Sequence, residues 1–306
     1  MPKILFSIFS LSLLMSCKVQ DSDNEMNKDQ KIQIVCTTSM LGDVVKAITG
    51  DKAQVDVLMG PGVDPHLFKA SQGDIALISE SNVLIFNGLH LEGKMIDVLE
   101  KTGSSKFAFD AGASLNAERL LQMDGTYDPH IWFDAEIWAT VCSNLMDSLV
   151  LWFPHHQDLF KANSEAYIKE LNDLHNWAKE QISTIPAEHR VLVTAHDAFG
   201  YFGRAYGLEV HALQGISTQA EFGLKDVSEL VNFITENKIP AIFVESSISE
   251  RSMKAVQKGC EERGLNVQVG GTLYSDAPGS IGTPEATYLG MFRHNVNTIK
   301  LALINE

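Results

Sequence analysis

The stretch KANSEAYIKELNDLHNWAKEQI, residues 161–182, decides how this 306-residue chain is organised. Its apolar residues recur at intervals of three and four positions: Tyr167, Leu171, Leu174, Ala178 and Ile182. This spacing predicts one amphipathic helix with a single buried stripe, about 33 Å long, which ends before Pro186. Because every turn of a helix is hydrogen-bonded, we expect domains joined by this segment to move little relative to each other.

Short apolar runs rich in β-branched residues alternate with longer helical patterns on both sides of this stretch. They lie at 32–35, 55–59, 83–87 and 107–110 in the first half, and at 191–195, 210–213, 241–245 and 267–270 in the second half. Such alternation is typical of parallel strands covered by helices. We therefore predict an α/β fold with two Rossmann-like lobes with parallel sheets, at 32–150 and 187–306, joined by one long rigid helix within a linking region at 151–186.

The N-terminal residues predict export and anchoring. Residues 1–16 carry one positive charge, at Lys3, followed by an apolar run that is too short to span a bilayer and ends before Cys17. This pattern predicts a bacterial lipoprotein signal peptide with Cys17 as the lipidated residue; an ordinary secretory signal is the alternative. Residues 17–31 are polar and predict a flexible tether to the membrane, outside the cytoplasm.

Charge and cysteine content exclude several kinds of protein. The formal net charge of −15 argues against a nucleic-acid partner, whose phosphates require a basic face. Beyond Cys17, the chain contains Cys36, Cys142 and Cys260, each in an apolar segment. Three widely spaced cysteines favour buried free thiols over a disulfide framework or a thiolate metal site.

The most informative motif is the tripeptide Asp-Pro-His, which occurs at 64–66 and again at 128–130. His196 and Asp276 follow predicted strands of the second half, and His66 follows a strand of the first half, where ligands of open α/β sheets bind. Three imidazoles and one carboxylate can form a four-coordinate transition-metal site. We therefore predict a metal site in the interlobe cleft, with ligands His66, His130, His196 and Asp276.

Two acidic residues allow other interpretations. Asp276 precedes Ala-Pro-Gly and could be a helix N-cap or a turn residue. Glu245 ends an apolar strand, where a buried carboxylate needs a partner. It could orient a ligand imidazole from outside the set of ligands, or it could cap the following turn.

Six ordered motifs resemble those of a known family. They are GVDPHLF (62–68), NGLHLE (87–92), DPHIWFD (128–134), HDAFGYF (196–202), ESS (245–247) and GGTLYSDA (270–277). Together they resemble the metal-binding lipoproteins of the ZnuA/TroA type, which supply manganese and zinc ABC importers. The resemblance covers nearly the whole chain after residue 31. It implies two α/β lobes joined by one rigid helix, with a divalent metal buried between them.

The resemblance implies that the metal ligands of the family correspond to His66, His130, His196 and Asp276. Manganese-biased relatives commonly have Glu at the position of His196, whereas zinc importers and the TroA-like group have His. Many zinc-dedicated relatives insert a histidine-rich loop in the first lobe, but residues 112–127 contain no histidine. The sequence therefore leaves Zn²⁺ and Mn²⁺ both open.

The expected function is that of a non-enzymatic, monomeric, lipid-anchored solute-binding protein. It would capture Zn²⁺ or Mn²⁺ outside the cytoplasmic membrane, in the periplasm or at the cell surface, and deliver the ion to an ABC permease. Two other classes are considered. A zinc metallohydrolase also uses His-rich sites but needs an open coordination position. A metal-independent adhesin would leave the predicted ligand set unexplained.

Overall fold

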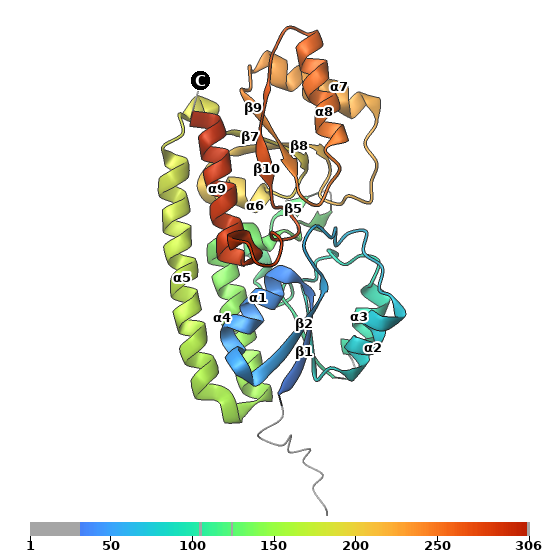
Figure 1. The fold of residues 1–306 in the computed structure, drawn as a ribbon, viewed down its shortest axis with the longest axis vertical. Coiled ribbons are helices and arrows are strands. Elements are labelled where there is room, and N and C mark those ends of the chain that lie inside the picture. The colour runs from blue at the N-terminus through green and yellow to red at the C-terminus, as the bar shows by residue number, and fades with distance from the viewer. Residues whose placement is uncertain (1–30, 104–105, 124, 305–306) are drawn as a thin grey trace, which may run out of the picture. The chain divides into compact units, whose positions relative to one another are not determined.

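All eight predicted strands are present in the computed structural model, which describes residues 31–103, 106–123 and 125–304 (Figure 1). The predicted signal peptide, Cys17 and all but the last residue of the predicted tether lie outside these ranges. Within them, no helix combines the length and the apolar composition needed to cross a membrane.

The first half contains a four-stranded parallel sheet. Its strands are β1 (Ile32–Thr38), β2 (Ala53–Met59), β3 (Val83–Phe86) and β4 (Phe107–Asp110), in the order β2-β1-β3-β4. The helices that follow β1, β2 and β3 are α1 (Ser39–Thr49), α2 (Gln72–Glu80) and α3 (Ile96–Gly103). β1 is almost completely buried because it lies between β2 and β3.

The second half contains two parallel strand pairs. They are β7 (Val191–His196) with β8 (Glu209–Gln214), and β9 (Ala241–Glu245) with β10 (Gln268–Leu273). β7 also lies against β9. The helices of this half are α6 (Gly200–Tyr206), α7 (Leu224–Glu236) and α8 (Arg251–Glu262). Val193, Ile242 and Val256 are fully buried in its core.

The predicted long helix is α5 (Gln157–Ser183), which is four residues longer at its start and one residue longer at its end than the pattern indicated. The whole predicted stripe is buried, and Phe160 extends it. α5 packs against α4 (Ala135–Trp152) and α1 of the first half, and against α6 and α9 (Tyr288–Ile304) of the second half. One helix therefore supports both halves, as predicted.

Short elements complete the chain. They are the 3₁₀ turns Gly50–Lys52, Ala117–Arg119, Ile131–Phe133, Pro154–His156, Ala187–His189 and Pro284–Ala286, and the hairpin of β5 (Gln122–Met123) and β6 (Thr126–Tyr127). The hairpin was not predicted, because strands of two residues have no periodicity. Cys36, Cys142 and Cys260 are buried free thiols, as predicted. From Lys31 onward the chain forms one compact unit, and its division at residues 150 and 186 stays a prediction.

Candidate metal centre

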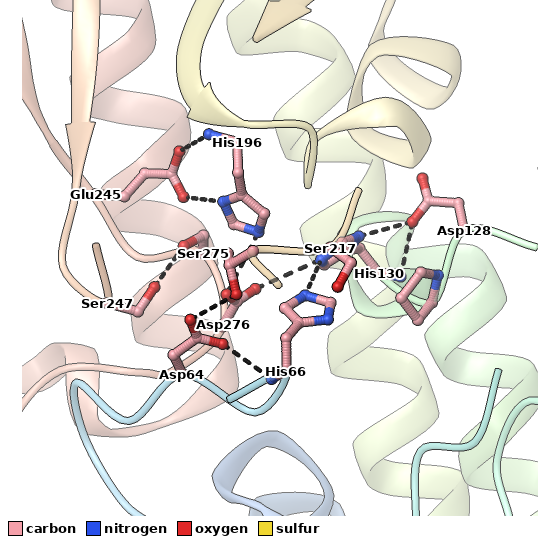
Figure 2. Close-up of polar contacts among 12 residues, drawn as sticks. Asp64, His66, Asp128, His130, His196, Ser217, Glu245, Ser247, Ser275 and Asp276 are labelled. Carbon is pink, nitrogen blue, oxygen red and sulfur yellow. Dashed lines mark hydrogen bonds and ion pairs between the residues drawn. The ribbon is translucent and has the colours of Figure 1, made fainter. Parts of the chain in front are cut away.

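The structure brings the four sequence-predicted side chains together (Figure 2). His66 lies in the loop after β2, His130 directly precedes the turn Ile131–Phe133, His196 is the last residue of β7, and Asp276 follows β10. One donor atom from each of the four lies within 4.8 Å of the others. Each half of the chain contributes two donors, although the four residues are spread over more than 200 positions of sequence.

The imidazoles face one another through the same ring nitrogen. Nε2 of His66 lies 3.3 Å from Nε2 of His130. Asp276 closes the group, with Oδ1 3.6 Å from His130 Nε2 and Oδ2 3.3 Å from His196 Nε2. All four residues are at most 2 % exposed. The site is therefore a buried cluster of three nitrogen donors and one carboxylate, the ligand types that transition metals use.

The two Asp-Pro-His tripeptides build the same local turn. In each, the aspartate accepts a hydrogen bond from the histidine backbone N–H two residues later, at 2.9 Å in Asp64–His66 and 2.9 Å in Asp128–His130. This is an Asx-type turn, and the intervening proline fixes φ near −65°. The turn therefore fixes the backbone direction of each histidine locally, before any tertiary contact forms.

Two of the three imidazoles are oriented by carboxylates through Nδ1. His130 Nδ1 lies 2.7 Å from Asp128 Oδ1, and His196 Nδ1 lies 2.6 Å from Glu245 Oε2. Donation of the Nδ1 proton to a carboxylate leaves the Nε2 lone pair facing the cluster, which is the tautomer that binds a metal. His66 Nδ1, in contrast, has no hydrogen-bond partner among the described residues.

Glu245 makes the first of the two interactions considered for it, with the imidazole of His196, and its second oxygen binds the neighbouring strand β7 instead of the following turn. Its Oε2 lies against the His196 ring, while its Oε1 accepts hydrogen bonds from the backbone N–H groups of Ala195 and His196, at 2.8 and 2.9 Å. The carboxylate is 3 % exposed. Its buried charge is therefore satisfied by three donors, and those donors come from the strand that carries His196.

Asp276 has no comparable support. Neither of its carboxylate oxygens accepts a hydrogen bond from the part of the chain that the structure describes, although both are buried. A buried carboxylate without donors is costly, so an unsatisfied one needs an explanation. Burial alone would raise its pKa, but the protonated imidazole of His196 beside it lowers the pKa below its ordinary range. Asp276 thus remains an anion that faces three imidazoles, which is a strong site for a cation.

The histidines differ in how firmly they hold a proton. Burial lowers the pKa of His66 to about 3, so this imidazole is neutral at physiological pH. Burial also disfavours protonation of His196, but the carboxylates of Glu245 and Asp276 outweigh it and raise the pKa of His196 well above its ordinary value. In the metal-free protein, protonated His196 therefore supplies a positive charge beside Asp276, where a bound metal ion would supply it instead.

Sequence reasoning did not identify three supporting residues. Asp128 orients His130, and Asn87 Nδ2 donates to the backbone oxygen of Pro129 at 2.9 Å. Glu92, 2 % exposed, accepts hydrogen bonds from Thr37 Oγ1 and from the backbone N–H of Asn87 at 2.7 and 2.8 Å. The repetition of Asp before Pro-His was the available signal for Asp128. The pattern contained no such signal for Asn87, since its partner lies 42 residues away.

A second cluster, Asp134, Glu136 and His175, also places its donor atoms within 4.8 Å of one another. Arginines already balance its carboxylates: Arg204 lies 3.8 Å from Asp134, and Arg119 lies 3.8 Å from Glu136. Asp134 in addition caps α4. This cluster is therefore an ion-pair network between α4, α5 and α6, and the nearby guanidinium groups oppose binding of a cation.

Comparisons with known proteins identify the family of the chain. The chain matches the family described as zinc-uptake complex component A, periplasmic (ZnuA), over residues 34–302. It is 45 % identical to the manganese-binding lipoprotein MntA of Bacillus subtilis over 305 residues, which is 99 % of this chain and 98 % of the relative. It is 40 % identical to the zinc-binding protein TroA of Treponema pallidum over 302 residues, 98 % of each chain.

The solved structure of periplasmic zinc-binding TroA from Treponema pallidum superposes with a TM-score of 0.89 at 42 % identity. The match covers 90 % of this chain and 100 % of the TroA chain. Agreement in sequence and in fold over almost the full length confirms the resemblance inferred from the six motifs. The chain therefore belongs to the ZnuA family of metal-binding transport components.

Proposed function

We propose that this protein captures one Zn²⁺ or Mn²⁺ ion through His66 Nε2, His130 Nε2, His196 Nε2 and the Asp276 carboxylate, and delivers it to the permease of an ABC importer. The observation that carries the proposal is the buried Asp276 carboxylate, whose two oxygens face the imidazoles and accept no hydrogen bond of normal geometry from the described residues. A divalent cation satisfies both oxygens and the converging nitrogens at once. The names of the relatives, manganese-binding MntA and zinc-binding TroA, support the same cargo.

The donor set suits both ions to different degrees. Three imidazole nitrogens and one carboxylate match the tetrahedral preference of Zn²⁺. Mn²⁺ prefers more oxygen ligands, and Asp276 can supply two because both of its oxygens face the cluster. Affinity favours zinc over manganese in the general order of divalent metals. We therefore expect Zn²⁺ to bind more tightly in vitro, whichever ion is transported.

The same geometry argues against a catalytic role. A hydrolytic zinc site has three protein ligands, with a water and a nearby base at the open position. Here four protein donors converge, and none is more than 2 % exposed, so a substrate has no access to the cluster. The carboxylates next to the site, Asp128 and Glu245, already bind imidazole Nδ1 atoms. We therefore propose binding and delivery without chemistry.

We further propose that the protein acts as a monomer outside the cytoplasmic membrane, held by a lipid on Cys17. The lipoprotein names of its relatives support this location. Replacement of Cys17 by Ser should move the protein from the membrane fraction to the soluble fraction without changing metal binding. Retention of Cys17→Ser in the membrane fraction would contradict the anchor.

The central test is metal content combined with unfolding. Protein purified from its native envelope should contain about one Zn²⁺ or Mn²⁺ per chain by elemental analysis. Because the ion binds only the folded state, added Zn²⁺ at about 1,000 times Kd should stabilise the metal-free protein by about 4 kcal/mol. His196→Ala and Asp276→Ala should abolish most of this shift. The matched control is His155→Ala, an exposed histidine on the turn before α5, which should keep it. An unchanged shift in both site variants would refute the assignment.

A further inference from the structure

The buried donors raise the question of how an ion reaches them. Residues 215–223, which we call the strap, connect β8 to α7 in the second half. Thr218 Oγ1 in the strap donates a hydrogen bond to Asp64 Oδ2, 2.7 Å away in the first half. The neighbouring Gln219 packs at Gly93, where an added Cβ would lie 2.8 Å from Gln219 Nε2. The strap thus contacts the first half at two adjacent points.

Asp64 connects the strap directly to the metal centre. Its Oδ1 accepts the backbone N–H of His66 at 2.9 Å while its Oδ2 holds Thr218 (Figure 2 shows the bond to His66). The first Asp-Pro-His turn is therefore tied across the two halves through a single carboxylate. Loss of the strap contact would release the loop that carries His66, without removing any of the four donors.

The strap contact is more exposed to water than two other hydrogen bonds between the halves. Trp132 Nε1 donates to the backbone oxygen of Ser275 at 3.0 Å, and Tyr288 Oη donates to the backbone oxygen of Trp132 at 2.7 Å, both in fully buried surroundings. The Thr218–Asp64 bond is only partly buried. Hydrogen bonds open at least cost where water can replace them. Two backbone N–H bonds between the halves, from Leu121 to Tyr201 Oη and from Tyr288 to Asp43 Oδ2, are also partly buried, but neither involves the turn that carries His66. Separation of the halves around His66 should therefore begin at the strap.

We propose that the strap is the gate for metal exchange and that the Thr218–Asp64 hydrogen bond is its latch, an inference that rests on the proposed metal-binding function. The latch holds the closed arrangement in which the four donors are sealed from solvent. Its opening precedes both uptake and release of the ion. Thr218 and Asp64 act as positioning residues, since neither places an atom in the cluster.

The test compares exchange rates in three variants. Thr218→Val removes the hydroxyl at nearly constant shape, and Thr218→Ser keeps it. Thr184→Val makes the same change at an exposed threonine directly after α5, whose hydroxyl donates to the backbone oxygen of Gln181. Release of bound Zn²⁺ to excess chelator and association of Zn²⁺ are followed by stopped-flow fluorescence. Thr218→Val should accelerate both steps about tenfold, the size expected for one hydrogen bond to a charged group, and so change Kd much less. Thr218→Ser and Thr184→Val should exchange like the parent.

The outcomes separate the gate from the proposed function. If the parent and Thr218→Val each bind one Zn²⁺ per chain with equal release rates, the gate is wrong and the metal site stands. If Thr218→Val weakens Kd with an unchanged association rate, Thr218 stabilises only the bound state, and the gate is again overturned. If the parent binds no Zn²⁺, both proposals fail. An Asp64→Asn background, which keeps an acceptor for His66 N–H, should reduce the effect of Thr218→Val.

Discussion

The two Asp-Pro-His tripeptides have the same sequence and the same backbone turn, but their aspartates make different second bonds. Asp128 directs its carboxylate back to its own histidine, at 2.7 Å from His130 Nδ1. Asp64 directs its free oxygen away from His66 and across to Thr218 of the other half. Identical local sequence therefore gives one proposed ligand, His130, that its own aspartate supports, and one proposed ligand, His66, whose loop is held by the opposite half of the molecule.

This difference separates two tasks of a metal-delivery site. A histidine locked by its own carboxylate keeps its donor atom in place whether or not the halves are in contact. A histidine without an Nδ1 partner, on a loop tied across the halves, can move when that contact opens. We infer that the ligand at His130 remains preorganised throughout exchange, whereas the ligand at His66 is assembled on closure.

The largest test of this contrast removes each imidazole in turn. His66→Ala and His130→Ala should each weaken Zn²⁺ binding by more than about a hundredfold, because loss of an outer partner alone costs roughly 10- to 100-fold. The metal-free proteins should differ: His130→Ala leaves the fully buried Asp128 without its ring partner and should lose about 3 kcal/mol of unfolding free energy. His66→Ala should lose clearly less. Chelator competition and urea unfolding measure the two quantities, and equal destabilisation of both apo variants would contradict the contrast.

The next test exchanges each aspartate for its amide. Asp128→Asn removes the charge that holds the His130 tautomer and should weaken Zn²⁺ binding about 10- to 100-fold. Asp64→Asn keeps an acceptor for the backbone of His66 and touches no ring nitrogen, so its affinity should stay within about threefold of the parent. The two variants are matched controls for each other. Equal losses in chelator competition would show that the shared turn, and not the second bond, supports the ligands.

A third test uses pH to compare His66 with His196. The Nδ1 atom of His196, like that of His130, has a carboxylate partner. Metal binding needs an unprotonated Nε2. The raised pKa of His196 means that the metal-free site holds a proton there at neutral pH, and binding must expel it. Affinity should therefore fall as pH drops below that raised pKa, by about tenfold per unit for one proton. His66, with its pKa lowered to about 3, has no proton to lose in this range.

Calorimetry in two buffers of different ionisation heat at pH 7 measures this proton release. The parent should release close to one proton per Zn²⁺ from the site. Glu245→Gln removes the carboxylate that contributes most to the raised pKa of His196, so it should release less. A constant affinity between about pH 7.5 and about pH 5 would contradict the proton-coupled site.

Much of this architecture could be predicted because it depends on local periodicity. The stripe from Tyr167 to Ile182 identified α5, and apolar β-branched runs identified eight strands to within a few residues. The four clustered side chains were named because proline-locked histidines and strand-end residues are unusual, and because six motifs resembled one family. Neither inference needed knowledge of tertiary contacts.

The remaining features depend on neighbours far away in sequence. Whether an Asp-Pro-His aspartate makes its second bond to its own histidine ring or to a threonine 154 residues away is decided by the packing of the halves. A strand-end carboxylate such as Glu245 can cap the following turn or orient an imidazole, and the neighbouring strand β7 decides for the second, because both carboxylate oxygens bind Ala195 and His196. The bonding partner of each carboxylate thus depends on the three-dimensional surroundings, because the local sequence is compatible with either partner.

The test with the smallest expected effect removes a hydrogen bond that Asn87 makes to the second Asp-Pro-His tripeptide. Asn87 Nδ2 donates to the Pro129 backbone oxygen, and Asn163 Nδ2 makes a bond of the same kind to the Ile48 backbone oxygen, at 3.0 Å and remote from the cluster. Asn87→Ala and Asn163→Ala should each lower the unfolding free energy of the metal-free protein by about 1 to 2 kcal/mol. Only Asn87→Ala should also weaken Zn²⁺ binding, by a few-fold, because Pro129 adjoins His130. If Zn²⁺ affinity were unchanged in Asn87→Ala, the Asx turn and Asp128 alone would fix His130, and its preorganisation would be entirely local.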